Sequence, residues 1–152
     1  RISVAFAEHE VVIQRDAMSI YNFLLDPRNL SSWRDGIRGV KLISGAAASK
    51  GAVYRPLFAG AAGPADADFA LTATRPGAEI EFEVVSGPVR ERGGYYLSTE
   101  NDSTRVRFAL RCRPAMAMLL RYPAVRRSLK AQVLELERLK SVLEPAQVQE
   151  AA

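Results

Sequence analysis

The 152-residue sequence is poor in residues that build metal sites and disulfides, with only one histidine and one cysteine. A single thiol, Cys112, excludes a disulfide within the chain, as is typical of proteins in a reducing cytoplasm. One histidine and one cysteine cannot build a zinc site, and the carboxylates do not cluster at metal-ligand spacing. We therefore expect a cytoplasmic protein with no metal and no cofactor. Because Cys112 alternates with polar positions of its strand, we expect it at the surface or half-buried.

Long apolar runs and complete catalytic motifs are also missing. No stretch approaches the ~20 apolar residues of a membrane span, so we expect no stable membrane insertion. Residues 60–63 are glycine-rich, but they lack the Gly-Lys-Ser/Thr ending of a phosphate loop. Ser86 and Ser98 do not lie in a nucleophile elbow.

Charge of one sign is only in modest excess. The formal net charge is +4, but the basic residues are spread along the chain and many have acidic neighbours. We read them as a solvated outer surface and expect no nucleic-acid binding. With 48% hydrophobic and 25% charged residues, the composition is that of a globular protein. We expect one domain over residues 1–144 and a loose tail over residues 145–152.

What the sequence does contain is a long periodic segment, residues 115–143, which predicts an amphipathic helix. Steps of three, four or their multiples place its apolar residues on one face. These residues are Met118, Tyr122, Val125, Leu129, Val133, Leu136 and Leu143. The opposite face carries Arg126 and Arg127 among other charged residues, and Glu135 and Arg138 are spaced to pair on the surface.

Pro123 lies inside this pattern. Because it removes one helical hydrogen bond and its ring crowds the preceding turn, we expect a kink or break there. An isolated helix cannot repay the cost of ordering its chain, so the apolar face needs a partner surface. The preceding segments supply one.

Alternating apolar residues predict seven strands with short turns between most of them, and therefore antiparallel hairpins. The predicted strands cover residues 2–14, 37–44, 51–59, 66–75, 78–86, 89–99 and 104–113. In the first strand, Val4 and Phe6 share one parity while Val11 and Ile13 share the other, which predicts a bulge near residues 8–10.

Two short helices are predicted between the first two strands, over residues 17–25 and 26–33. Asp16 provides an N-cap for the first, and Asp26 followed by Pro27 begins the second. Two short helices cannot bury their apolar faces in each other. We expect them to close one end of the sheet.

Closing the predicted turns fixes the register of the hairpins. The turn at residues 100–103 places Leu97 opposite Val106 and Tyr95 opposite Phe108, and the turn at residues 87–88 places Arg92 opposite Glu83. Acidic and basic residues then face each other on the outer side. The inner side is apolar and aromatic, with Phe69, Leu71, Ile80, Phe82, Tyr95, Leu97, Val106 and Phe108.

This order of elements resembles the helix-grip fold of the START-related (SRPBCC) superfamily, in its polyketide cyclase/dehydrase-like branch. The resemblance covers residues 4–143 and rests on a few local segments, none specific for a reaction. These are residues 12–17, residues 20–27 ending at Trp33, residues 50–51, residues 103–106 and residues 139–140. It implies an α+β fold in which a seven-stranded, curved antiparallel sheet wraps around a long C-terminal helix, with two short helices between strands 1 and 2.

The resemblance also implies a pocket between sheet and helix that holds a hydrophobic small molecule of the lipid, polyketide or quinone type. The candidate pocket walls are Trp33, Tyr54, Phe58, Phe69, Leu71, Phe82, Tyr95, Phe108, Met118 and Tyr122. Core packing explains several of these equally well. No catalytic motif of the superfamily can be placed on this chain residue by residue.

Four residues are candidates for acid–base chemistry in such a pocket: Tyr95, Glu91, Arg55 and His9. Tyr95 combines apolar area with a hydroxyl group for a ligand carbonyl. Glu91 falls on the inner parity, where a residue at the rim of the sheet is the simpler interpretation. The sequence leaves the facing of Arg55 and His9 open, and a paired strand residue is the ordinary role of such a histidine.

Three functions remain open at this stage. The first is a binding protein, monomeric or a homodimer, that sequesters an apolar or aromatic small molecule. The second is a polyketide cyclase/dehydratase-like enzyme that uses a pocket Tyr, Arg or Glu. The third is a protein-interaction module that uses the basic helix face around Arg126 and Arg127.

Overall fold

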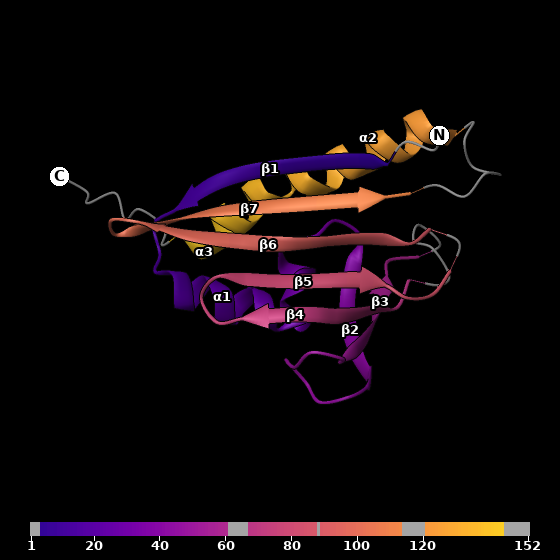
Figure 1. Cartoon of the computed structure of the whole chain (residues 1–152), viewed down its shortest axis with the longest axis horizontal. Helices are drawn as coiled ribbons and strands as arrows, with labels where there is room; N and C mark the ends of the chain where they lie inside the picture. Colours follow the sequence, from indigo (N-terminus) through magenta and orange to yellow (C-terminus); the bar gives the residue numbers. More distant parts are fainter. Residues whose placement is uncertain (1–3, 61–66, 88, 114–120, 145–152) are drawn as a thin grey trace.

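The computed structural model describes residues 4–60, 67–87, 89–113 and 121–144. Its strands form one seven-stranded antiparallel sheet with the order β1-β7-β6-β5-β4-β3-β2 (Figure 1). Strands β2 to β6 each pair with the next strand in sequence, as expected for antiparallel hairpins, and β1 pairs with β7. The strands are β1 (Ala5–Ile13), β2 (Ile37–Ser44), β3 (Val53–Phe58), β4 (Phe69–Arg75), β5 (Glu79–Val84), β6 (Glu91–Glu100) and β7 (Ser103–Cys112).

Two short helices connect β1 to β2, and two helices follow β7 within the described residues. The Asp16 carboxylate accepts the N–H of Ser19 at 3.0 Å, and the Asp26 carboxylate accepts the N–H of Arg28 at 3.1 Å, so both predicted caps are present. The second short helix is a 3₁₀ helix with Pro27 in its first turn. The helices are α1 (Ala17–Leu25), η1 (Pro27–Ser32), α2 (Tyr122–Leu134) and α3 (Leu136–Leu143). The predicted α+β architecture, a curved antiparallel sheet with a C-terminal helix and two short helices after the first strand, is confirmed.

The described part of the C-terminal helix contains a break that the sequence did not predict. Its described part begins at Tyr122, which places Pro123 in the first turn, where the missing N–H costs no helical hydrogen bond. The break lies at Glu135, whose N–H donates to the carbonyl of Gln132 at 3.1 Å in a tighter, 3₁₀-type turn. The expected kink or break at Pro123 concerns the junction with residues that are not described, so it stays a prediction. Residues 114–120, with Met118, and the tail at residues 145–152 lie outside the described part.

The first strand is regular. All its residues pair with β7 in an unbroken register, so the predicted bulge near residues 8–10 is wrong. The apparent change of phase came from Val4 and Phe6, two apolar residues that are exposed. The Phe6 side chain lies on the outer side, while Ala5, Ala7, Val11 and Ile13 all point inward and are buried.

The helix packs with its apolar face on β1 and β7, and α1 packs on β5 and β6 at the other side of the concave face (Figure 1). The residues that the helix buries are Leu129, Val133, Leu136, Leu139 and Leu143. Cys112 belongs to this core and is buried rather than at the surface, because the last residue of β7 still faces inward. Burial also raises the pKa of its thiol, which leaves it a poor nucleophile.

The predicted hairpin registers are confirmed. Leu97 pairs with Val106 and Tyr95 with Phe108, as the short turns required. On the outer side, Arg107 reaches Glu8 at 3.1 Å. The charges of the outer face are thus arranged in cross-strand pairs, and the concave face is left to apolar and aromatic side chains.

Candidate functional site

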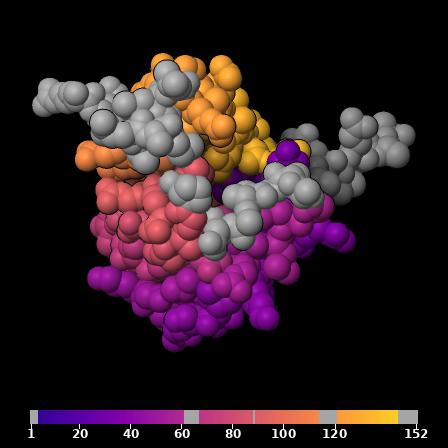
Figure 2. All heavy atoms as spheres, turned by 90° about the vertical axis from the view of Figure 1, so that its right-hand side faces the viewer, coloured from indigo at the N-terminus to yellow at the C-terminus, as the bar shows by residue number. Residues whose placement is uncertain are grey.

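A cavity of about 730 Å³ lies between the sheet, the segment that follows η1, and the C-terminal helix. Figure 2 shows the end of the molecule at which α2, in orange, lies over the strands. One wall is formed by side chains of β3, β4 and β5 and of the short helices. The other is formed by the helix, which contributes Ser128, Ala131, Gln132, Glu135 and Arg138.

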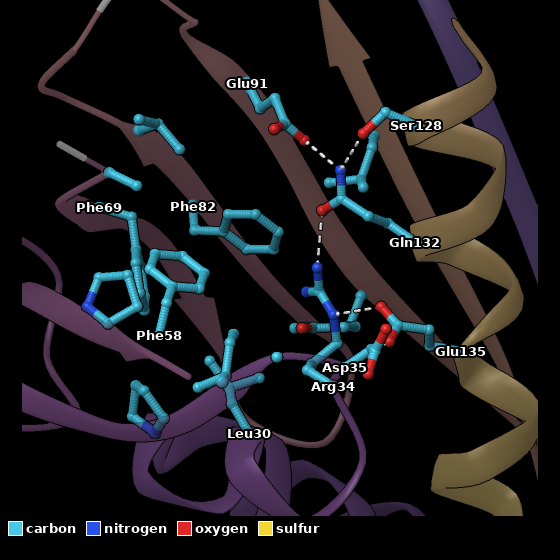
Figure 3. A pocket seen from close by; sticks show the side chains of 18 of the residues that line it. Leu30, Arg34, Asp35, Phe58, Phe69, Phe82, Glu91, Ser128, Gln132 and Glu135 are labelled. Atoms are coloured by element: carbon cyan, nitrogen blue, oxygen red, sulfur yellow. Dashed lines mark hydrogen bonds and ion pairs between the residues drawn. The ribbon is translucent and has the colours of Figure 1, made fainter. Parts of the chain in front are cut away.

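The sheet wall is aromatic. Phe58, Phe69 and Phe82 lie on the side of the cavity opposite the helix (Figure 3). Phe69 and Phe82 meet edge to face, with ring centroids 6.2 Å apart. Gly93 in β6 makes room for this packing, because a Cβ there would lie 3.2 Å from the Phe82 ring and would overlap the carbonyl oxygen of Ala109. The close approach of three strands at this point therefore depends on a glycine.

The helix wall is polar. The amide of Gln132 donates to the Glu91 carboxylate at 3.0 Å and to the Ser128 hydroxyl at 3.3 Å. Its carbonyl oxygen accepts from Arg34 Nη2 at 2.6 Å, and Arg34 Nε donates to Glu135 Oε1 at 3.0 Å. Figure 3 shows this line of contacts running along the helix, across the cavity from the phenylalanines. We call Glu91, Gln132, Arg34 and Glu135 the polar series.

The centre of the polar series is Arg34, and the fold holds it from several sides. Its N–H donates to the carbonyl of Leu30 at 2.8 Å, at the end of η1. The guanidinium lies 5.6 Å from the ring centroid of Trp33 and 5.4 Å from that of Phe108. The side chains of Arg34 and Glu135 are only 13% and 15% exposed, so this ion pair is largely removed from water. The break in the helix turns Glu135 toward it, where the carboxylate also accepts the N–H of Asp35.

Burial changes the acid–base properties of two lining residues. Burial raises the pKa of the Tyr95 phenol to about 12, although the nearby Arg34 guanidinium opposes this shift. Tyr95 therefore stays protonated at neutral pH and can donate a hydrogen bond. Burial also raises the pKa of Glu91, against the opposing effects of its hydrogen bond from Gln132 and of the positive charge on Arg34.

The sequence-predicted residues divide into those that line the cavity and those that do not. The lining includes Phe58, Phe69, Leu71, Phe82, Tyr95 and Glu91. Trp33, Tyr54 and Phe108 are buried in the core behind this lining, where Trp33 contacts both Tyr95 and Phe108 edge to face. Tyr122 lies at the start of α2, and its hydroxyl reaches the carbonyl of Val4 at 3.4 Å.

Neither His9 nor Arg55 lines the cavity. His9 Nε2 lies 2.6 Å from Glu137 Oε2, so it ties β1 to α3. Arg55 pairs with Asp68 through two contacts of 3.0 Å, and this pair lowers the pKa of the Asp68 carboxyl. Both residues thus have structural partners outside the lining of the cavity.

Arg34, Gln132 and Glu135 were not predicted as site residues. The helix pattern predicted a surface pair of Glu135 with Arg138, but the carboxylate turns inward to Arg34. One signal was available, since Arg34 directly follows the tryptophan that ends the second short helix, where the chain enters the sheet. Nothing in the helix pattern indicated that its 3.6-residue period changes at Glu135.

Solved structures of similar fold are numerous, although no family model and no curated protein matches the sequence. The di-domain ARO/CYC StfQ of the steffimycin biosynthetic pathway superposes with a TM-score of 0.73 at 11% identity. The match covers 92% of this chain but only 50% of StfQ, so the chain spans half of that protein. The chain has the START-related helix-grip fold.

Other helix-grip structures match over nearly their full length. Norcoclaurine synthase from Thalictrum flavum has a TM-score of 0.71 at 12% identity, with 95% of this chain and 89% of the synthase covered. A START superfamily protein from Mycobacterium smegmatis has a TM-score of 0.68 at 12% identity, with 91% and 96% covered. At such identities the likeness defines the fold alone, and the helix-grip scaffold accommodates enzymes as well as proteins of other kinds.

Two further observations bear on what the site can hold. Among the described residues, no group of three His, Cys, Asp or Glu side chains is placed to bind a metal ion. In the same part of the chain, none of the helices combines the length and the apolar character needed to cross a bilayer.

Proposed function

We propose that this protein binds a hydrophobic, partly aromatic small molecule in the cavity between sheet and helix. The observation that carries the proposal is the division of the cavity into an aromatic wall and a polar series that face each other (Figure 3). Ligand sites in proteins are commonly concave and largely apolar, with a few polar groups that orient the ligand. A volume of about 730 Å³ is within the range of small-molecule pockets. The helix-grip neighbours StfQ and norcoclaurine synthase, named for their chemistry on organic molecules, support the same class of ligand.

In this proposal the aromatic and the polar residues of the cavity have different roles in binding. The rings of Phe58, Phe69 and Phe82 supply apolar contact area, which favours a flat or aromatic ligand. Tyr95 and Glu91 supply the hydrogen bonds that fix its orientation. The free energy of binding then comes mainly from the aromatic rings, and the selectivity mainly from Tyr95 and the polar series.

The test is a fluorescence titration with N-phenyl-1-naphthylamine, an uncharged dye that brightens in apolar surroundings. We expect saturable binding, and Phe82→Ala should weaken it by about tenfold, because truncation removes most of one ring from the wall. Phe6→Ala is the matched control, since Phe6 is exposed on the outer side of β1. Equal loss in both variants, or no binding by the wild-type protein, would contradict the proposal. Native mass spectrometry of freshly purified protein would show whether a small molecule co-purifies.

A second function, cyclase/dehydratase-like catalysis, is favoured by one observation: Glu91 and Tyr95 line the same cavity and both have raised pKa values. A carboxylate with a raised pKa is a better general base near neutral pH, and a phenol that stays protonated can donate to the carbonyl oxygen where negative charge develops. Glu91 would take a proton from the carbon between two carbonyl groups of a poly-β-ketone. The resulting enolate would then attack a second carbonyl of the same molecule.

The two functions separate experimentally. Under the catalytic hypothesis, Glu91→Gln and Tyr95→Phe abolish formation of a cyclised product from a poly-β-ketone while dye binding persists. Product yields equal to wild type in both variants would exclude it and leave the binding function intact. Neutralising Arg126 and Arg127 addresses the interaction hypothesis, which requires that a protein partner be lost while dye binding is unchanged.

A further inference from the structure

The charged residues that line the cavity differ in how far they are exposed to water. Its lining includes two cations, Arg34 and Arg138, and three acidic residues, Asp35, Glu91 and Glu135. Arg138 is exposed, so water screens its charge. Arg34 is largely buried, and its charge would therefore act strongly on any group that enters the cavity.

The buried guanidinium of Arg34 already donates hydrogen bonds to two side chains of the protein. Its Nε donates to Glu135 at 3.0 Å and its Nη2 donates to Gln132 at 2.6 Å. Glu135 balances the positive charge, and Gln132 passes the line of hydrogen bonds on to Glu91. The guanidinium is further packed near the rings of Trp33 and Phe108, which limits its freedom to turn toward a ligand.

We propose that Glu135 is a specificity-determining residue: by occupying Arg34 it makes the cavity accept uncharged ligands that carry a carbonyl or hydroxyl group and reject carboxylates. This inference rests on the proposed binding function and narrows its ligand class. An entering carboxylate loses its water shell and meets an arginine whose charge is already balanced, with Glu91 close by in the same series. A ketone oxygen needs only a donor, and the hydroxyl of Tyr95 provides one in the same cavity.

Removing the carboxylate from Glu135 should invert this preference. Glu135→Gln keeps nearly the same shape but leaves Arg34 as a buried cation with no counter-charge from the helix. A buried charge without a partner is costly, and a ligand carboxylate placed beside Arg34 would supply the missing partner. The same replacement changes little for a ketone, which carries no charge.

The experiment compares two competitors of similar shape, 2-acetylnaphthalene and 2-naphthoate, for displacement of bound N-phenyl-1-naphthylamine at neutral pH. For the wild-type protein, the ketone should compete at least about tenfold more tightly than the carboxylate. In Glu135→Gln, the carboxylate should bind at least about tenfold more tightly than it does to wild type, while the ketone changes by less than about threefold. A wild-type protein that binds both equally, or a Glu135→Gln variant with an unchanged ratio, would overturn the proposal.

The chain offers a matched control on the same helix. Glu137 pairs with His9 and does not line the cavity, so Glu137→Gln should leave both competitors unchanged. The double variant Arg34→Met/Glu135→Gln should lose the gain for the carboxylate, which shows that the gain acts through Arg34. Retention of the gain in the double variant contradicts the proposal. Thermal unfolding checks each variant, and if Glu135→Gln does not fold, the wild-type ratio and the double variant decide.

The outcomes also separate this inference from the proposed function. If neither the dye nor either competitor binds, the proposed function fails and this inference fails with it. If the dye binds and the two competitors displace it equally, binding stands and only the charge selection is lost.

Discussion

The outer face of the sheet and the wall of the cavity both carry arginine–carboxylate pairs, yet their surroundings differ. On the outer face, Arg107 lies 3.1 Å from Glu8, and the two side chains are 38% and 47% exposed. In the cavity, Arg34 lies 3.0 Å from Glu135, and these side chains are 13% and 15% exposed. Water and salt screen the outer pair, whereas breaking the inner pair leaves a charge that water cannot reach well. The two ion pairs have nearly the same distance between their charged atoms, so the difference in their expected contribution to stability comes from exposure to water.

The largest expected effect is at the inner pair. Glu135→Ala should lower the free energy of unfolding by about 3 kcal/mol, because it leaves Arg34 without a counter-charge and the N–H of Asp35 without its acceptor. Urea unfolding measures this. A loss below about 1 kcal/mol would mean that the inner pair behaves like an exposed one.

A double replacement sharpens the same comparison. Arg34→Met/Glu135→Leu removes both charges together, and it should recover most of the stability lost in Glu135→Ala, since no unpaired charge remains. The recovery is read from the same urea unfolding curves. If the double variant is as unstable as the single one, packing rather than charge explains the loss.

A smaller effect, and one that depends on pH, is expected at Glu91. Burial raises its pKa in the folded protein above the ordinary value of 4.5, so the folded state holds this proton more tightly than the unfolded state. The stability from this group is present in full below its unfolded pKa and is lost as the pH rises through the folded pKa. Glu91→Gln does not ionise, so its stability relative to wild type should increase as the pH rises through that window. Parallel pH profiles of the two proteins would contradict this.

The smallest effect is expected on the outer face. Glu8→Gln should change the free energy of unfolding by about 0.5 kcal/mol or less, because its partner Arg107 is exposed and also lies 4.4 Å from the ring centroid of Tyr96. The difference should shrink further at high salt. An effect as large as that of Glu135→Ala would remove the distinction between the two faces.

The aromatic side of the cavity could be predicted from the sequence because it follows from local rules. Alternation places Phe82 on the inner face of its strand, and a short turn fixes Tyr95 opposite Phe108. Both depend on residues close together in the chain. The exposed Phe6 shows where such reasoning fails, since an aromatic residue on the outer face changes the apparent phase of a strand.

The polar side could not be predicted in this way. Arg34 and Glu135 are 101 residues apart, and their pairing depends on how the end of η1 meets the C-terminal helix. It also depends on the tightened turn at Glu135, which no propensity in the helix sequence indicates. Periodicity assigned this carboxylate to the surface, and only the tertiary contact of its neighbours turns it inward.

The break at Glu135 lies between two halves of the helix that both pack on the first strand. Beyond it, Leu136, Leu139 and Leu143 are buried, and Lys140 reaches the carbonyl of Val12 at 2.8 Å, so α3 anchors the helix to the first strand. Before it, Ser128 and Ala131 are exposed positions of α2 that border the cavity. Substitutions at these exposed positions can therefore reshape the border of the cavity while the buried leucines keep the helix on the sheet.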